Sequence, residues 1–211
     1  MQLIGMLDSP YVRRVAISLQ LLGLPFEHRA VSVFSTFEQF REINPVVKAP
    51  SLVCDNGVVL MDSSLIIDYA EALAGRSLMP ADLDARQQAL RVIGLALAAC
   101  EKSVQIIYEN KLRPAEKMHQ PWVYRVTGQL LAACTALEAE LARAPLATGE
   151  DNIDQAGIST AVAWHFIQRM VPELVKAEDF PALQRFSAQA ELLPAFAAAP
   201  HGDGAYAGPT E

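Results

Sequence analysis

The stretch Ser9-Pro10-Tyr11-Val12 lies between a short apolar segment and a long helical pattern. Strand signals end near Met6, and apolar residues recur at helical spacing from Val12 onward, so the stretch predicts the first turn of a helix that follows a strand. Cysteines at the Ser9 and Val12 positions would form a Cys-x-x-Cys redox motif. Both sulfurs are missing, which indicates that the reactive sulfur of such a site comes from a ligand.

The first 80 residues or so alternate between strand and helix patterns in the order β-α-β-α-β-β-α. The expected strands are 2–6, 26–33, 51–54 and 58–61, and the expected helices are 10–22, 37–43 and 62–73. The last two strands are joined by Asp55-Asn56-Gly57, a strong hairpin signal. We therefore expect parallel pairing in the first half of this region and antiparallel pairing in the second.

Helical patterns continue from there almost to the end of the chain. Long helices are expected at 86–112, 121–141 and 156–171, and shorter ones after Pro181 and Leu192. Residues 76–84, which contain Pro80, read as a connection. The pattern predicts an α/β domain over 1–78, a linker over 79–84, an all-α helical domain over 85–200 and a flexible tail over 201–211.

Composition and charge exclude several classes of protein. The 211 residues are 52% hydrophobic and 19% charged, which is typical of a globular protein with one or two domains. The net charge of −7, with no basic cluster, argues against nucleic acid and an anionic membrane as partners. No apolar run approaches the ~18 residues that span a bilayer, and no Lys or Arg precedes Arg13 as in a signal peptide. Cys54, Cys100 and Cys134 are widely spaced, which predicts neither a zinc site nor a disulfide framework and favours the cytoplasm.

Three short motifs contain groups that suit a small peptide ligand. Ser9 is either only an N-cap or a hydroxyl that donates to a thiolate at the positive end of a helix. Pro50, just before a strand, is either an ordinary loop proline or a cis-proline that exposes the backbone of Ala49 to an extended peptide. Asp62 and Ser63 are either helix caps or a pocket in which Ser63 binds a carboxylate and Asp62 binds an ammonium group. Together the motifs predict a site for the thiol, the backbone and the amino-acid end of one peptide.

With these motifs the chain resembles the cytosolic glutathione S-transferases over nearly its whole length, most closely the bacterial Ser-type members. The segments that carry the resemblance are Ser9-Pro10-Tyr11-Val12-Arg13, Asn44-Pro45-Val46-Val47-Lys48-Ala49-Pro50 and Leu60-Met61-Asp62-Ser63-Ser64-Leu65-Ile66. The resemblance implies a thioredoxin-like N-terminal domain, an all-α C-terminal domain and a cytoplasmic homodimer. It also implies glutathione as co-substrate, with no metal.

The resemblance assigns glutathione binding to Ser9, Lys48, Ala49, Pro50, Asp62 and Ser63. In this assignment Ser9 is the catalytic hydroxyl that activates the glutathione thiol. Ala49 pairs with the backbone of the glutathione cysteine beside cis-Pro50, and Lys48 lies near the glycine carboxylate. The pair Asp62-Ser63 holds the γ-glutamyl group.

Two departures from the family pattern and one neighbouring charge modify this expectation. Ala49 stands where the family usually has Val, so it keeps the backbone contact but packs less. The family's Ser/Thr-x-x-Asp capping box is replaced by a segment in which Asp154 can cap but Gly157 cannot reciprocate, which predicts a softer helix start. Asp8 beside Ser9 opposes thiol activation, because a nearby carboxylate raises the pKa of a thiol.

An acceptor pocket is expected between the two domains, with Tyr11, Tyr108, Leu112 and Trp164 as its candidate residues. Tyr108 and Leu112 share one helical face at i, i+4, whereas the alternative for Trp164 is packing in the core. The expected activity is a detoxifying glutathione transferase that attacks a small hydrophobic electrophile. A glutathione-dependent peroxidase or isomerase, and a non-catalytic glutathione-binding protein, stay open because one fold hosts many functions.

Overall fold

A computed structural model describes residues 1–206, which form two compact units. The first unit contains Met1–Leu78 together with residues 192–206, and the second contains Met79–Glu191. Each unit has its own buried apolar side chains. The units are described separately below.

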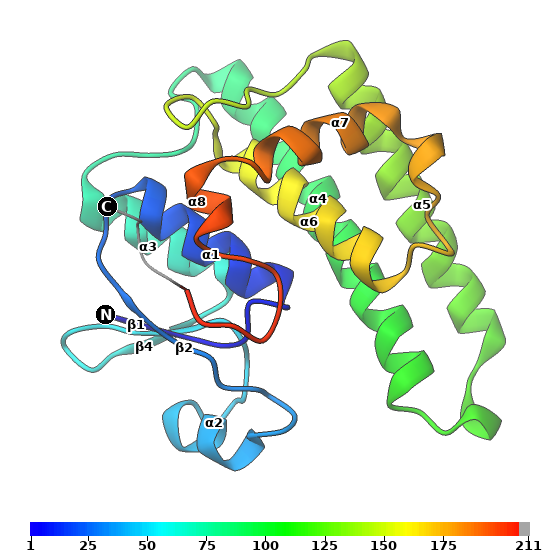
Figure 1. Cartoon of the computed structure of the whole chain (residues 1–211), viewed down its shortest axis with the longest axis horizontal. Coiled ribbons are helices and arrows are strands. Elements are labelled where there is room, and N and C mark those ends of the chain that lie inside the picture. The colour runs from blue at the N-terminus through cyan, green and yellow to red at the C-terminus, as the bar shows by residue number, and fades with distance from the viewer. Residues whose placement is uncertain (207–211) are drawn as a thin grey trace. The chain divides into compact units, whose positions relative to one another are not determined.

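The first unit is a four-stranded sheet with helices on its two faces (Figure 1). Its elements are β1 (Gln2–Ile4), α1 (Pro10–Leu21), β2 (Glu27–Arg29), α2 (Phe37–Ile43), β3 (Ser51–Val53), β4 (Val59–Met61) and α3 (Ser63–Ala74). The strand order is β2-β1-β3-β4, with β1 parallel to β2 and the other two pairs antiparallel. The predicted element order, pairing and thioredoxin-like fold class are confirmed.

Alternation along β1 explains why both faces of the sheet are covered. Ile4 is fully buried in a cluster with Phe40 of α2 and Val31. Leu3, its neighbour in the strand, is also fully buried and points to the opposite face, because side chains alternate along a strand. On that face α1 and α3 pack against each other. The first residues of α1 and α3 are thereby fixed at one end of the sheet.

The second unit is all-α, as the helical patterns predicted. Its helices are α4 (Leu83–Lys111), α5 (Gln120–Arg143), α6 (Gln155–Met170) and α7 (Pro181–Ala190), with short 3₁₀ turns η1 (Ala115–Lys117) and η2 (Ala177–Asp179). Helix α6 is the central element, since every residue from 155 to 164 is buried. It packs against α4 and α7, and α4 also packs along α5.

The beginning of α4 lies inside the predicted linker. Helix α4 starts at Leu83, because the side chain of Asp82 accepts a hydrogen bond from the Ala85 N–H at 2.9 Å. Asp82 is therefore an N-cap, a role that Asp fills well. The helical pattern had predicted a start at Arg86, three residues later. Pro80 nearby is a stronger loop signal than the cap, so the sequence pattern places the start of this helix too late.

The C-terminal part of the chain differs from the prediction more than any other part. Residues 192–200, predicted to belong to the helical domain, group with the first unit instead. They include α8 (Pro194–Ala197), which packs against α1 (Figure 1). Of the tail predicted over 201–211, residues 207–211 lie outside the described residues. Residues up to Tyr206 are in place on the first unit, where Tyr206 stacks on Phe26.

Gly157 at the start of α6 has a packing role that the capping pattern did not indicate. Asp154 caps the helix as predicted, accepting a hydrogen bond from the Gly157 N–H at 2.8 Å. A methyl group at Gly157 would lie 2.8 Å from Ile153 Cγ1 and 3.4 Å from Phe186 Cζ. The close approach of these two side chains therefore requires a residue without Cβ.

We expect Gly157→Ala to lower the free energy of unfolding by about 1 kcal/mol, because overpacking costs about 1–3 kcal/mol and outweighs a helix-propensity gain of about 1 kcal/mol. Gly128→Ala in α5 is the matched control. Among the described residues, no heavy atom lies within 4 Å of a methyl group at Gly128, so stability should rise by up to ~1 kcal/mol. Urea denaturation of both variants measures the two changes, and a stabilised Gly157→Ala protein would contradict the packing role.

Candidate functional site

Ser9 lies at the N-terminus of α1, as its sequence context predicted. It has extended backbone angles and its Oγ accepts a hydrogen bond from the Val12 N–H at 3.4 Å. The first helical bond runs from the Arg13 N–H to the Ser9 carbonyl at 3.0 Å. Because the hydroxyl acts as an acceptor toward the helix, its own hydrogen is available to donate to a further group. The helix dipole adds partial positive charge at this position.

The loop before β3 contains a cis peptide bond between Ala49 and Pro50, as predicted. The buried side chain of Asn44 supports the loop from the end of α2. Its Nδ2 donates to Ser51 Oγ at 2.8 Å, and Ser51 Oγ donates to the Lys48 carbonyl at 2.7 Å. The backbone of Ala49 therefore has a fixed position at the end of the sheet.

The start of α3 brings acidic, hydroxyl and cationic groups together. Asp62 is the N-cap and accepts a hydrogen bond from the Ser64 N–H at 3.0 Å. Its other oxygen lies 3.9 Å from Lys48 Nζ, and both side chains are about half exposed, so this ion pair is weak. Ser63 is buried and accepts a hydrogen bond from Arg14 Nη1 at 3.0 Å. Lys48 thus lies beside Asp62, and its assignment to the glycine carboxylate stays a prediction.

Gly5 is the point at which α1 and the cis-proline loop meet. It has a φ of 139°, and a methyl group there would lie 2.6 Å from Val12 Cγ2 and 3.2 Å from Ala49 Cβ. The Lys48–Asp62 and Arg14–Ser63 contacts join these two segments to α3. The three predicted motifs therefore converge on one end of the first unit.

Three residues of this region were not assigned a role from the sequence. Gly5 follows directly after β1, and a glycine at the end of a strand signals a close approach of backbone. The partner of Arg14, Ser63, lies 49 residues away, so no local pattern indicates this contact. The third is His28 of β2, whose Nε2 lies 2.7 Å from the Gly5 carbonyl.

Asp8, the expected opponent of thiol activation, has a raised carboxyl pKa. Burial, followed by the negative charge of Asp203, raises the pKa of the Asp8 carboxyl, and a hydrogen bond from the Ser9 N–H lowers it in part. A raised pKa means that the carboxylate is protonated more readily than a free Asp.

The four candidate acceptor residues do not share one environment. Tyr108 and Leu112 line a hollow of about 460 Å³ at the end of α4, together with Trp122, Pro114 and four other residues. Trp164 is only 4% exposed and packs edge-on against Phe180 in the core of the second unit. Trp164 is therefore a core residue and does not line an acceptor pocket. Tyr11 is half-buried on the first turn of α1, and its acceptor role stays a prediction.

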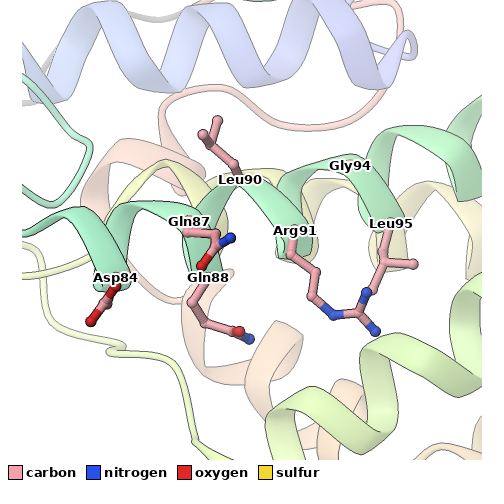
Figure 2. A pocket seen from close by; sticks show the side chains of 7 residues that line it. All are labelled: Asp84, Gln87, Gln88, Leu90, Arg91, Gly94 and Leu95. Carbon is pink, nitrogen blue, oxygen red and sulfur yellow. The ribbon is translucent and has the colours of Figure 1, made fainter.

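A second hollow, of about 530 Å³, lies on α4 and is shown in Figure 2. It is lined by both polar and apolar residues: Asp84, Gln87, Gln88, Leu90, Arg91, Gly94 and Leu95. Gln88 and Arg91 donate to the carboxylate of Glu140 on α5 at 2.7 and 2.6 Å. Hydrogen bonds from Arg143, then Arg91 and Gln88, lower the pKa of Glu140 to about 2. These polar groups join α4 to α5, and this hollow is not our candidate site.

Three further features of residues 1–206 bear on possible partners and chemistry. No helix in this part of the chain is both long and apolar enough to cross a bilayer. The same residues contain no cluster of three or more His, Cys, Asp or Glu side chains with the arrangement of a metal site. The cysteines Cys54, Cys100 and Cys134 are buried and form no disulfide bond.

Residues 3–78 match the family model described as the glutathione S-transferase N-terminal domain. Glutathione S-transferase Z1 of Arabidopsis thaliana is 32% identical to this chain over 199 residues, which cover 89% of this chain and 86% of that protein. A solved structure of a glutathione transferase family member from Pseudomonas fluorescens Pf-5, with bound S-(propanoic acid)-glutathione, is 32% identical, with a TM-score of 0.78. That match covers 94% of this chain and 95% of the other.

A further solved structure is the holo form of maleyl pyruvate isomerase, described as a bacterial glutathione S-transferase of the zeta class. It is 26% identical to this chain, with a TM-score of 0.74. The match covers 94% of this chain and 96% of the other. Both the sequence and the structural likenesses therefore extend through the two units.

Proposed function

Because this chain belongs to the glutathione S-transferase superfamily, we propose that it binds glutathione at the convergent end of the first unit and activates the thiol for attack on a small hydrophobic electrophile. The observation that carries this proposal is the meeting of α1 and the cis-proline loop at Gly5. A hydroxyl at a helix start then lies on the same end of the sheet as an exposed backbone for a peptide. The bound glutathione derivative in the Pseudomonas relative supports the ligand.

In the proposed mechanism, Ser9 stabilises the thiolate of glutathione. Its hydroxyl donates to the sulfur while its oxygen keeps the bond from the Val12 N–H. The helix dipole favours the same negative charge. Such surroundings lower a thiol pKa from ~8.5 by one to several units, so the nucleophile is largely ionised at neutral pH. The thiolate then attacks the electrophilic carbon, and the displaced group leaves with the electron pair of the broken bond.

The remaining residues hold the two ends of glutathione in this proposal. Ala49 beside cis-Pro50 pairs with the cysteine backbone, as a peptide pairs with a sheet edge. Asp62 binds the γ-glutamyl ammonium group and Ser63 its carboxylate, while Lys48 binds the glycine carboxylate. The weak Lys48–Asp62 ion pair is readily exchanged for these ligand groups, since exposed pairs are worth about 0–1 kcal/mol.

Glutathione-dependent isomerisation is the second candidate, and the likeness to maleyl pyruvate isomerase favours it. In such a reaction the thiolate adds to a conjugated double bond and is expelled after rotation about the resulting single bond. Glutathione is then regenerated, whereas a transferase consumes one glutathione for each product formed. Peroxide reduction and glutathione binding without catalysis stay open as alternatives from the sequence.

One set of measurements tests these alternatives. Isothermal titration with glutathione measures binding, and the ultraviolet absorbance of the bound thiolate against pH measures the pKa of the thiol. Free thiol is then counted against product over a panel of aryl halides, epoxides, peroxides and conjugated cis-diacids. Loss of thiol equal to product supports the transferase, and turnover without loss supports the isomerase. A protein that does not bind glutathione would refute the proposal.

We further propose a cytoplasmic homodimer that serves detoxification. Helix α3 presents exposed apolar side chains at i, i+4 and i+8, namely Leu65, Tyr69 and Leu73, which are 65%, 37% and 52% exposed. An apolar stripe of this kind supports contact with a second copy. Three cysteines that are buried and form no disulfide bond support a reducing compartment.

A further inference from the structure

The segment 199–206, here named the C-terminal strap, runs along the first unit after α8. Figure 1 shows it as the red segment that leaves α8 and passes beside α1. It contacts the first unit at its beginning, through Ala199, and at its end, through Tyr206. One contact is at Arg13, shortly after Ser9 in the sequence, and the other is at His28 of β2, whose ring in turn contacts the Gly5 carbonyl shortly before Ser9.

The first contact fixes the opening turn of α1. Arg13 is 1% exposed, and its Nε donates to the Ala199 carbonyl at 2.7 Å. Its guanidinium also lies over the ring of Phe196, 5.7 Å from the centroid. Because the Arg13 N–H makes the first helical bond to the Ser9 carbonyl, a held Arg13 fixes the turn that Ser9 caps.

The second contact fixes the ring of His28. The backbone N–H of Tyr206 donates to His28 Nδ1 at 2.9 Å, so this nitrogen is the acceptor and the ring proton is on Nε2. Nε2 therefore donates to the Gly5 carbonyl at 2.7 Å. Tyr206 is itself held by stacking on Phe26 and by a bond from its hydroxyl to Gln20 Oε1 at 2.8 Å.

Gly5 begins the four-residue segment that leads into Ser9. Its N–H donates to the Arg29 carbonyl at 3.1 Å, and the Ser9 N–H closes the segment by donating to the Met6 carbonyl at 3.2 Å. Because the turn between Gly5 and Ser9 is short and tight, a hydrogen bond that fixes the Gly5 carbonyl also restricts the position of the Ser9 hydroxyl. Asp203 in the strap also lies near enough to Asp8, within this turn, for the two carboxyl charges to interact.

We propose that His28 and Tyr206 are positioning residues for the thiol site, and that the C-terminal strap holds Ser9 from both sides in the geometry that ionises the ligand thiol. This inference rests on the proposed function of Ser9. Neither residue is assigned a contact with glutathione; His28 acts through the Gly5 carbonyl, and Tyr206 acts through His28. The strap, which consists of the last residues described, therefore supports the thiol site of the first unit.

The test compares two truncations of the full chain. One removes residues 206–211 and the other, the matched control, removes only 207–211 and keeps Tyr206. Two substitutions provide an independent route: His28→Leu removes both ring hydrogen bonds, whereas His28→Gln supplies one donor and one acceptor in their place. The measured quantities are the pKa of the bound glutathione thiol, kcat/KM below that pKa, and amide hydrogen exchange over residues 5–13 without ligand.

We expect deletion of 206–211 and His28→Leu to raise the thiol pKa by about one unit and to lower kcat/KM about tenfold, because small misplacements of an activating group have effects of this order or larger. Exchange over 5–13 should become faster in both. The 207–211 deletion and His28→Gln should stay within about twofold of wild type for kcat/KM, since they keep both hydrogen-bond roles.

A folded 206–211 deletion or His28→Leu protein that keeps the wild-type thiol pKa and exchange rates would overturn the inference, even if its Tm is lower. Failure of the wild-type protein to bind glutathione has a different meaning. It refutes the proposed function, and the exchange comparison over residues 5–13 then decides by itself whether the strap positions Ser9.

Discussion

Ser9→Ala is expected to raise the pKa of bound glutathione by one to two units and to lower kcat/KM about 10- to 100-fold at pH 6.5, because the thiolate loses its hydroxyl donor and each unit is a tenfold change in ionisation. The dissociation constant for glutathione should change less than about threefold. The variant keeps the contacts with the glutathione backbone and γ-glutamyl group, and it can still bind the uncharged thiol. The pKa is read from thiolate absorbance against pH in the saturated complex.

Two control variants separate activation of the thiol from capping of the helix. Ser9→Thr keeps a hydroxyl and should retain most of the lowered pKa. Asp82→Ala removes the N-cap of α4, whose bond to the Ala85 N–H is 2.9 Å long, and should cost about 1 kcal/mol of stability. It should leave the thiol pKa unchanged. If Ser9→Ala binds glutathione with the wild-type thiol pKa, Ser9 has no role in activation.

The order of strands and helices was predictable because its signals are local. Asp55-Asn56-Gly57 gave the hairpin, and Gly57 has the positive φ, 83°, that such a turn needs. Gly75 ends α3 with a φ of 64°, as its position after the helical pattern indicated. The strand predicted over 26–33 was too long, because β2 pairs only over Glu27–Arg29. At the edge of the sheet it has one neighbouring strand, so alternation alone did not fix its ends.

Within the candidate site, the residues that cap helices were predictable from the sequence, but the side-chain contacts between distant segments were not. Ser9 and Asp62 were identified because a cap is a local choice of residue before a helix. The bond between Arg14 and Ser63 joins positions 49 apart, and the bond between Tyr206 and His28 joins positions 178 apart. Periodicity carries no information about such pairs, since it reports which face of an element is buried and not what lies opposite.

Trp164 also shows that periodicity does not identify the tertiary partner of a side chain. Its helix, α6, is buried on nearly all sides, so helical periodicity gave no polar face by which to orient the indole. An aromatic residue on such a helix is compatible with a pocket wall and with a core. The edge-on contact with Phe180 decides for the core. A tertiary contact therefore settled a choice that the residue type left open.

Gly5→Ala is expected to lower the free energy of unfolding by about 3–5 kcal/mol, the largest stability effect that we predict for a single methyl group, because backbone strain costs ~1–3 kcal/mol and overpacking a similar amount. The φ of 139° is one that residues with a side chain rarely adopt. The added methyl would lie 2.6 Å from Val12 Cγ2, and Val12 is fully buried, so it has little room to move. Urea denaturation measures the loss.

Two further variants divide this effect into its causes and connect it to the site. Gly57→Ala has a φ of 83° and, among the described residues, no heavy atom within 4 Å of its methyl, so it reports backbone strain alone, about 1–3 kcal/mol. In a double-mutant cycle, Val12→Ala should cost about 1 kcal/mol or more less in the Gly5→Ala background than in the wild type, because it removes the clash. Relief of the clash alone leaves the strained turn before Ser9 in place, so the double variant should bind glutathione with a thiol pKa above that of the wild type. A double variant with wild-type thiol pKa would show that Gly5 serves packing only.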